Sequence, residues 1–173
     1  MIGLFCKEKE NSMKVLFIGG TGKISSACTA DAVSRGIDLF ILNRGQTRRE
    51  IPDAVTVIQG DCRQKQQMKE LLRDHRFDVV VNWIAYSPRH IENDIELFKG
   101  QTGQYIFISS ASVYQTPPKY LPITESTPCY NPYWTYSQDK MACEERLMAE
   151  YRESGFPVTI VRPSHTYDRT MLI

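Results

Sequence analysis

A tyrosine and a lysine four residues apart form the pair with the clearest chemistry in this sequence. Tyr136 and Lys140 have the spacing that places two side chains on one face of a helix. An ammonium group beside a phenol stabilises the phenolate, so this spacing predicts a tyrosine pKa lowered from its usual value of about 10. Such a tyrosine can give or take the proton of a hydroxyl or carbonyl group while a hydride moves.

A serine-rich segment supplies a second polar group. Ser110 lies within Ser109-Ser110-Ala111-Ser112, directly after an apolar run that we predict to be a strand. A serine at the carboxyl end of a parallel strand points into the crevice where ligands bind, and there its hydroxyl can bond to a reacting oxygen. Residues 111–133, with five prolines and no periodicity, separate this serine from Tyr136. A loop of that length inside a compact domain is more often functional than idle.

A glycine-rich segment near the N-terminus has the spacing of a phosphate-binding loop. It runs from Gly19 to Ser25, after an apolar run and before an amphipathic stretch. Glycines in this context permit a tight turn and a close approach of the backbone to a pyrophosphate, which the helix N-terminus then binds. Ser25 replaces the third glycine, at a position where a small residue still packs closely. We predict cofactor contacts from five loop residues, namely Gly19, Thr21, Gly22, Lys23 and Ile24.

The segment after the second apolar run bears on the choice between NAD and NADP. A carboxylate about twenty residues after the glycine loop accepts a hydrogen bond from the ribose 2′-hydroxyl of NAD. Asn43 and Arg44 stand there instead, and Arg44 can pair with a 2′-phosphate or stack on adenine. Arg48 and Arg49 are close by in sequence. These residues favour NADP, unless Arg44 is a solvated arginine of the loop.

The dipeptide Asp61-Cys62 follows the third apolar run and is a further candidate for the cofactor site. The carboxylate can accept a hydrogen bond from the adenine amino group. It can equally cap a helix that begins near Arg63, and the sequence leaves both interpretations open.

These groups need a scaffold that brings the ends of several strands together. Short runs rich in Val, Ile and Phe alternate with amphipathic stretches, as in parallel sheets whose strands are buried on both faces. Gly36, Gly100 and Gly155 stand where helices should end. The alternation predicts an α/β fold, a doubly wound parallel sheet of the Rossmann type. We predict strands at 14–18, 39–42, 55–58, 79–82, 105–109 and 158–161, and helices at 24–35, 63–73, 90–99 and 136–153.

Length, composition and charge narrow the class of protein. With 173 residues, 42% hydrophobic and 24% charged, the chain has the size of one globular domain, which we place at residues 13–173 after a disordered leader, residues 1–12. A net charge of +1 gives no reason to expect nucleic acid as a partner, and no apolar run is long enough to cross a membrane. The five cysteines lack a C-x-x-C pair and metal-ligand spacing, which indicates reduced thiols, a cytoplasmic protein and no metal site.

Taken together, these motifs resemble those of the extended short-chain dehydrogenase/reductases, the NAD-dependent epimerase/dehydratase family. The resemblance covers residues 13–167 and rests on VLFIGGTGKIS, VVVNWIAYSP, YIFISSASVY, the Tyr136/Lys140 pair and VTIVRPSHTY. The GGTxxIS loop and the asparagine–arginine pair are most similar to an atypical branch typified by chloroplast stem-loop-binding proteins. The resemblance implies a Rossmann fold, an NAD(P) cofactor and hydride chemistry on a nucleotide sugar or a related hydroxyl or carbonyl substrate.

The same resemblance assigns roles to the chemical residues. Ser110 would polarise the reacting oxygen and Tyr136 would be the acid/base. Lys140 would lower the pKa of Tyr136 and bond to the nicotinamide ribose.

The resemblance places further residues beside the cofactor or in the scaffold. Asn82 and Ala85 would line the cofactor near its ribose and pyrophosphate, and the backbone around Pro163 would meet the nicotinamide amide. We interpret Arg162 as a strand-end residue and Glu144, four residues after Lys140, as part of a surface pair on the helix.

Family members continue well beyond the R-P motif into a substrate-binding region, whereas this sequence ends at Ile173. We therefore expect a C-terminally truncated chain, or one whose site another chain completes. The expected function is that of an NAD(P)-dependent epimerase/dehydratase-like oxidoreductase acting on a nucleotide sugar, with turnover by this chain left open. The alternatives are a cofactor-binding module without turnover and an RNA-binding relative, against which the near-neutral charge argues. Family members often dimerise through helices matching residues 90–99 and 136–153, which implies a homodimer.

Overall fold

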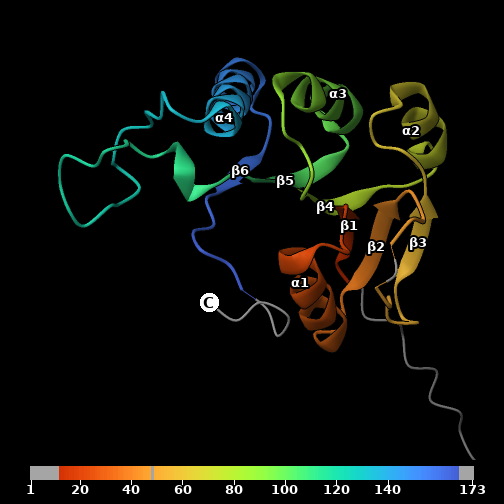
Figure 1. Cartoon of the computed structure of the whole chain (residues 1–173). Coiled ribbons are helices and arrows are strands. Elements are labelled where there is room, and N and C mark those ends of the chain that lie inside the picture. Colours follow the sequence, from red (N-terminus) through yellow and green to blue (C-terminus); the bar gives the residue numbers. More distant parts are fainter. Residues whose placement is uncertain (1–11, 48, 168–173) are drawn as a thin grey trace, which may run out of the picture.

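Six parallel strands form one sheet in the computed structural model, which describes residues 12–47 and 49–167. The strands are β1 (Lys14–Ile18), β2 (Asp38–Asn43), β3 (Thr56–Gln59), β4 (Phe77–Asn82), β5 (Thr102–Ile108) and β6 (Val158–Val161). Their order across the sheet is β3-β2-β1-β4-β5-β6, so the chain builds toward one edge, returns to β1 and then builds toward the other (Figure 1). This order confirms the predicted doubly wound Rossmann sheet.

Helices cover the two faces of the sheet unequally. They are α1 (Lys23–Ser34), α2 (Lys65–Leu72), α3 (Pro88–Phe98) and α4 (Thr135–Ser154), and a 3₁₀ turn, η1 (Ala111–Val113), follows β5. Figure 1 shows α2, α3 and α4 along one face and α1 on the opposite face. Right-handed crossovers explain this division, because the connections toward β3 and those toward β6 cross the sheet in opposite directions.

Alternate residues of β1 enter two separate hydrophobic clusters. Leu16 and Ile18 pack with side chains of α2, α3 and α4, whereas Val15 and Phe17 pack with side chains of α1. Successive side chains of a strand point to opposite faces, so a continuous apolar run can serve both clusters. The hydrophobic core therefore lies on both sides of the central strand.

The predicted helix ends at Gly36, Gly100 and Gly155 are confirmed. Helices α1, α3 and α4 end within two residues of these glycines, whose φ angles of 72°, 69° and 72° lie in the left-handed region. Helix α2 begins two residues later than expected. The reason is that Asp61 Oδ1 accepts a hydrogen bond from the Arg63 N–H at 3.0 Å, which forms a separate turn first.

Two strands begin two or more residues earlier than their apolar runs. β4 starts at Phe77 and β5 at Thr102, and these two residues are partners in the parallel ladder. Backbone groups form the ladder, so each strand continues through the polar residues that precede its apolar run.

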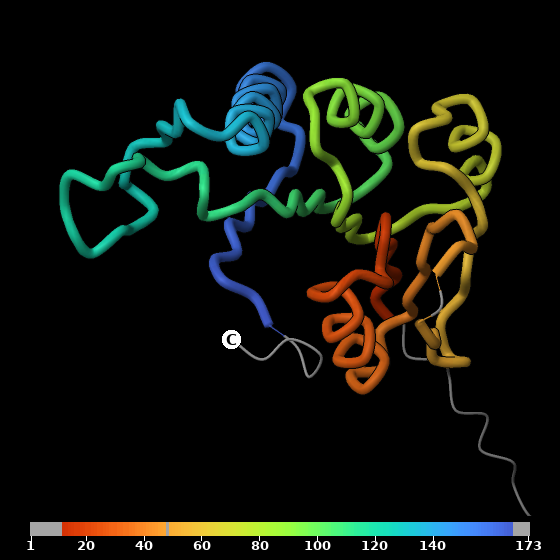
Figure 2. The backbone as a smooth tube through the Cα atoms, in the orientation of Figure 1, coloured from red at the N-terminus to blue at the C-terminus, as the bar shows by residue number. Residues whose placement is uncertain are grey.

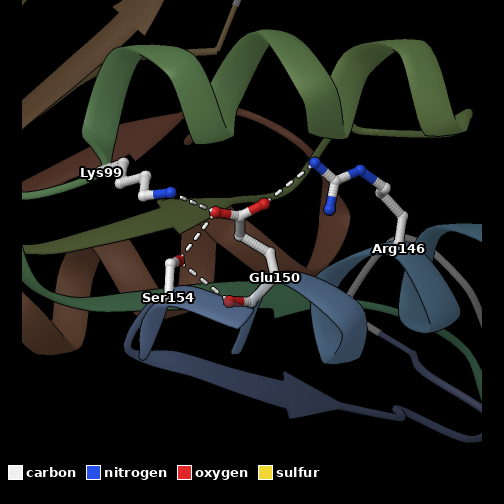
Figure 3. Close-up of polar contacts among 4 residues, drawn as sticks. All are labelled: Lys99, Arg146, Glu150 and Ser154. Carbon is white, nitrogen blue, oxygen red and sulfur yellow. Dashed lines mark hydrogen bonds and ion pairs between the residues drawn. The ribbon is translucent and has the colours of Figure 1, made fainter. Parts of the chain in front are cut away.

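A buried carboxylate fastens α4, the helix that carries the tyrosine–lysine pair, to the end of α3. Glu150 is 5% exposed and accepts hydrogen bonds from Lys99 Nζ at 2.7 Å and Arg146 Nη2 at 2.9 Å (Figure 3). Ser154 Oγ donates to the same carboxylate at 2.7 Å. These bonds, first among them the one from Lys99, lower the pKa of the Glu150 carboxyl to about 2. The cluster fixes how α4 lies against its neighbour.

The segment between η1 and α4 extends away from the sheet, as the green-to-cyan tube in Figure 2 shows. It carries large apolar side chains that are exposed, among them Tyr120, Leu121 and Ile123. The predicted leader, residues 1–12, lies outside the described residues except for Ser12. Across the described part of the chain, none of the helices has the length and apolar character needed to span a membrane.

Candidate cofactor and active site

A cavity of about 790 Å³ opens at the carboxyl ends of β1, β2, β3 and β4. It lies where the strand order reverses, between β1 and β4, which is the position at which doubly wound sheets bind ligands. Nine of the predicted cofactor residues line it, namely Gly19, Thr21, Gly22, Lys23, Ile24, Asn43, Arg44, Asp61 and Cys62. The structure therefore brings the glycine loop and the ends of β2 and β3 together around one cavity.

The glycine loop has a backbone that other residues would not readily adopt. Gly19 and Gly20 have φ angles of 102° and 55°. A Cβ at Gly19 would lie 2.9 Å from Ile84 Cγ2, and one at Gly20 would lie 2.7 Å from Ile41 Cδ1. The loop thus packs directly against two neighbouring strand ends and presents its backbone to the cavity.

Ser25, the residue in place of the third glycine, closes the loop onto the start of α1. It is buried, and its Oγ accepts a hydrogen bond from the Gly22 N–H at 2.8 Å. Gly22 has a φ of −77°, and a Cβ there would meet Ser25 Oγ at 3.3 Å. The substitution of serine for glycine is therefore accommodated, as the sequence indicated.

The last residue of β2, Asn43, contributes an amide, and the segment after it contributes Arg44 and Arg49. Asn43 Oδ1 accepts a hydrogen bond from the Gly45 N–H at 2.8 Å, whereas Asn43 Nδ2 is buried without a partner among the described residues. Arg44 is exposed and lines the cavity. Arg49 reaches back to the glycine loop, where its Nη1 donates to Gly22 O at 3.2 Å and to Ser26 Oγ at 2.5 Å. Arg48 lies outside the described residues.

Asp61 and Cys62 form the wall at the end of β3. The Asp61 carboxylate both lines the cavity and accepts from the Arg63 N–H, so one of its oxygens serves the turn before α2. The helix-capping interpretation is wrong, because α2 begins at Lys65 with Gln64 as its N-cap, and Asp61 accepts within the turn before the helix. Burial raises the pKa of the Cys62 thiol to about 11, so this cavity-lining side chain is uncharged at neutral pH.

Two residues expected beside the cofactor are placed below the cavity lining. Asn82 is 3% exposed, and its Nδ2 donates to Asp94 Oδ2 at 2.5 Å while its Oδ1 accepts from the Ile84 N–H at 2.8 Å. Ala85 is also buried. The side chains in the lining are those of Trp83, Ile84 and Tyr86. Sequence reasoning missed Trp83, whose Nε1 is buried without a partner among the described residues.

The buried carboxyl group of Asp94 is hydrogen-bonded to Asn82 at the end of β4. Asp94 of α3 accepts hydrogen bonds from Asn82 Nδ2 and from Tyr105 Oη, each at 2.5 Å. Burial nevertheless raises the pKa of Asp94 to about 6, because desolvation of the charged form outweighs the two hydrogen bonds. The cluster holds the end of β4 and the loop that follows it.

Lys140 is buried beside two cavity-lining residues, Tyr86 and Ile108. Its Nζ donates to the carbonyl oxygens of Ala85 and Ile108, both at 2.7 Å. The ammonium group lies 4.8 Å from the centre of the Tyr86 ring and 4.7 Å from that of Phe107. Burial lowers its pKa to about 8. A lysine in this position still carries its proton at neutral pH and gives the site one fixed positive charge.

The expected lowering of the Tyr136 pKa by Lys140 is wrong for this structure. Burial, followed by the neighbouring Tyr86, raises the pKa of Tyr136, and the Ser110 hydroxyl opposes that rise. The Lys140 ammonium lies 5.8 Å from the Tyr136 ring centre and is directed at two carbonyl oxygens. The four-residue spacing predicts that the two side chains lie near each other, which they do. Lys140 Nζ is nevertheless hydrogen-bonded to two backbone carbonyl oxygens and not to the phenol.

Ser110, Tyr136 and Lys140 form a group next to the cavity, although none of the three is among its lining residues. The Ser110 hydroxyl acts to lower the pKa of Tyr136, and the Lys140 ammonium lies 5.8 Å from the centre of the Tyr136 ring. Two cavity-lining residues connect this group to the glycine loop: Tyr86, whose ring centre is 6.3 Å from that of Tyr136, and Ile108, whose carbonyl accepts from Lys140. A ligand that fills the cavity would therefore extend toward the tyrosine.

Glu144 is not the surface residue that the helix spacing suggested. It is 6% exposed and forms a two-point ion pair with Arg162, with Nε–Oε1 and Nη2–Oε2 distances of 3.0 and 2.6 Å. Ser109 Oγ also donates to Glu144 at 2.5 Å. The pair joins α4 to the end of β6, which agrees with the strand-end interpretation of Arg162. Pro163 follows, and its carbonyl accepts from the Ala111 N–H at 2.9 Å, outside the cavity lining.

Comparison with known proteins relates this site to a family. The family model described as "NAD dependent epimerase/dehydratase family" matches residues 15–170. A curated UDP-glucose 4-epimerase from Lactobacillus helveticus is 31% identical over 169 residues, covering 87% of this chain and 51% of that protein.

Solved structures give the same fold at lower identity. The UDP-glucose 4-epimerase of Thermus thermophilus in complex with NAD aligns with a TM-score of 0.75 and 23% identity over 87% of this chain and 54% of that one. The dTDP-glucose 4,6-dehydratase of Bacillus anthracis in complex with NAD aligns with a TM-score of 0.75 and 19% identity over the same shares. This chain spans about half the length of these three proteins.

The residues of the cavity fit a nicotinamide dinucleotide. The glycine loop leaves space where a Cβ would collide with a neighbour, and two buried N–H donors, from Asn43 and Trp83, have no partner in the described chain. Donors of this kind suit the phosphate and ribose oxygens of a dinucleotide. Residues 12–47 and 49–167 contain no group of His, Cys, Asp and Glu side chains arranged to hold a metal ion.

Proposed function

Because this chain belongs to the NAD-dependent epimerase/dehydratase family, we propose that it binds NAD(P) in the glycine-loop cavity and serves hydride chemistry on a nucleotide sugar. The observation that carries this proposal is the connection between the cavity and the Ser110, Tyr136 and Lys140 group through Tyr86 and Ile108. When bound, the nicotinamide ring supplies a hydride donor or acceptor.

The chain's own residues handle the proton of the reacting hydroxyl group. Tyr136 gives or takes that proton at its Oη, and the Ser110 hydroxyl bonds to the same reacting oxygen. Lys140, protonated at neutral pH, holds a positive charge near the phenol while its Nζ remains bonded to Ala85 O and Ile108 O.

The test is turnover of nucleotide sugars by the full chain. UDP-glucose and UDP-galactose, each incubated with NAD⁺ or NADP⁺, should show interconversion or reduction of the cofactor. Absence of both reactions, with the cofactor shown to be bound, would contradict the catalytic part of the proposal.

We propose NADP(H) as the preferred cofactor of this site. Three cationic side chains and one carboxylate line the cavity, and the carboxylate, Asp61, lies at β3 rather than at the end of β2. Arg44 at the end of β2 can bond to a 2′-phosphate, which would contribute a charge-assisted hydrogen bond. Calorimetric titration with NADP⁺ and NAD⁺ should give at least about a tenfold preference for NADP⁺, which Arg44→Ala should remove. Tighter binding of NAD⁺ would refute this assignment.

A second candidate function is cofactor binding without turnover. Two residues that shortly precede Tyr136 in the chain, Tyr133 and Trp134, are 75% and 54% exposed, and the Trp134 ring centre lies 4.9 Å from that of Tyr136. A site that is open on this side would bind cofactor while leaving a sugar unconstrained. Saturable binding of NADP⁺ with no reaction of either UDP-sugar is the result that favours this candidate.

A further inference from the structure

An exposed tryptophan adjoins the candidate acid/base at the start of α4. The Trp134 ring centre lies 4.9 Å from that of Tyr136, and the two ring planes are inclined by 40°. Side chains two positions apart within a helix do not face each other. Trp134 instead has an extended backbone, with a φ of −133° and a ψ of 111°, because it precedes the first helical residue. Its place at the helix end therefore lets its ring lie against that of Tyr136.

Trp134 stands at a position where other residue types stabilise a helix. It is the N-cap of α4, at which Ser, Thr, Asp or Asn accepts a hydrogen bond from the first turn. Within the described residues, the tryptophan side chain makes no such bond. Its backbone is nevertheless fixed, because its carbonyl oxygen accepts from the N–H groups of Ser137 at 2.9 Å and Gln138 at 3.1 Å. A residue that departs from the local preference beside a candidate site is typical of functional positions.

A series of aromatic rings leads from the cavity to Trp134. Tyr86 lines the cavity, and its ring centre lies 6.3 Å from that of Tyr136, which in turn adjoins Trp134. Tyr86 and Trp134 are 41% and 54% exposed, so each offers ring surface to a ligand. A ligand that extends from the cavity past Tyr86 to Tyr136 therefore comes within reach of the Trp134 ring.

We propose that Trp134 is a specificity-determining residue that packs against the C–H face of the sugar ring whose hydroxyl group reacts at Tyr136. This assignment rests on the proposed function, because it names the part of the nucleotide sugar that lies here. A pyranose ring presents C–H groups on its faces and hydroxyl groups around its rim. An aromatic ring can therefore cover one face and leave the hydroxyl groups free to form hydrogen bonds.

The reacting hydroxyl group determines which part of the substrate lies at Trp134. It must come within hydrogen-bond distance of Tyr136 Oη. The sugar ring that carries it then lies beside Tyr136 and the adjoining Trp134, whereas the base is separated from that ring by the diphosphate. The proposal accordingly assigns the sugar, and not the base, to the tryptophan.

The test is calorimetric titration of the full chain, saturated with NADPH, with UDP-galactose and separately with UDP. Reduced nicotinamide cannot accept a hydride, so the sugar is not oxidised during the titration. Trp134→Ala should weaken binding of UDP-galactose about tenfold, because it removes the apolar contact, and should leave the affinity for UDP unchanged. Trp134→Phe keeps an aromatic face and should stay within about threefold of the unmodified chain. Tyr151→Ala, at a 52% exposed position of the same helix, is the matched control and should change neither affinity.

A serine at the same position separates binding from a purely structural role. Trp134→Ser supplies the missing side-chain cap, which offsets the lost ring contact with Tyr136. Its thermal unfolding midpoint should therefore lie within about 2 °C of that of the unmodified chain, while its affinity for UDP-galactose falls about tenfold. A parallel loss of stability and affinity would show that the ring only packs on Tyr136, and would overturn the proposal.

The outcomes separate this proposal from the proposed function. Weaker binding of UDP-galactose alone in Trp134→Ala supports the proposal even if no UDP-sugar reacts. Turnover of UDP-galactose with an unchanged affinity and KM in Trp134→Ala overturns it and leaves the proposed function standing. Equal weakening of UDP and UDP-galactose also overturns it, because that result would place the base at Trp134. Failure of UDP-galactose to bind the NADPH-loaded chain overturns it as well.

Discussion

The glycine loop lines the cavity and the Tyr136 group adjoins it through Tyr86 and Ile108, and the two are built from different parts of the chain. The loop is a local structure in which residues of Gly19–Ser25 line the cavity. The Tyr136 group is assembled from Ser110, which lies between β5 and η1, and from two residues of α4, and a long proline-rich segment separates the two parts. The glycine loop therefore depends on backbone shape, whereas the Tyr136 group depends on contacts between segments that are distant in sequence.

This difference predicts that binding and chemistry can be lost separately. Changes at the loop should weaken cofactor binding and leave the tyrosine in place. Changes that loosen α4 should disturb the tyrosine group and leave the loop intact. The substitutions below each alter one region, and the measurements compare cofactor binding, turnover and stability.

The largest effect is expected from Tyr136→Phe. Removing the phenol oxygen removes the acid/base, so any turnover of a nucleotide sugar should fall by about 10²–10⁴-fold. Cofactor affinity should stay within about twofold, because the loop does not depend on this oxygen. Tyr151→Phe on the same helix is the control, since Tyr151 is exposed. Unchanged turnover in Tyr136→Phe would remove the proposed acid/base.

Glu144→Gln should have the largest effect on stability. It leaves Arg162, a largely buried cation, without its carboxylate partner, and breaking such a pair costs about 3 kcal/mol of unfolding free energy. The measurement is urea denaturation, with Glu145→Gln at the neighbouring exposed position as the control. Equal midpoints for the two variants would show that the ion pair does not hold α4 to β6.

Asp94 should make stability depend on pH in a distinctive direction. Its pKa of about 6 lies above that of an unfolded aspartate, so the folded state binds more protons between pH 4 and 6. Unfolding free energy should therefore fall as pH rises through this range, by up to about 2 kcal/mol, and then level off. Asp94→Asn should lack this component, which the difference between the two pH profiles isolates. Parallel profiles would contradict the assignment.

A smaller effect is expected at the loop. Gly22 has a φ of −77°, so alanine fits the backbone, but the added methyl group would occupy the surface that a pyrophosphate approaches. Gly22→Ala should weaken cofactor binding by about tenfold, or about 1.4 kcal/mol, with little change in unfolding free energy. Gly36→Ala, at the far end of α1 from the cavity, should lose stability and keep its affinity. Equal affinity in Gly22→Ala would place the pyrophosphate elsewhere.

The same contrast explains which features were predictable from sequence. Strands, helix ends and the glycine loop follow from local patterns, and the predictions at Gly36, Gly100 and Gly155 are confirmed. Their causes are properties of single residues or short runs, such as the freedom of glycine to adopt a positive φ.

The features that sequence did not reveal depend on contacts between distant segments. Glu144 looked like a surface residue because its partner, Arg162, lies on another element. Lys140 was expected to act on Tyr136, but its carbonyl partners come from the ends of β4 and β5. Trp83 follows Asn82 directly, and a pattern alone could not show that the tryptophan lines the cavity while the asparagine lies below it.

The central claim is that the glycine-loop cavity binds a nicotinamide dinucleotide, and a fluorescence titration with NADPH tests it most directly. Trp83 lines the cavity, so excitation of tryptophan should be transferred to bound NADPH. We predict saturable quenching of tryptophan emission with a matching rise in nicotinamide emission, shifted to higher concentration in Gly22→Ala. No saturable signal with either NADPH or NADH would contradict the account.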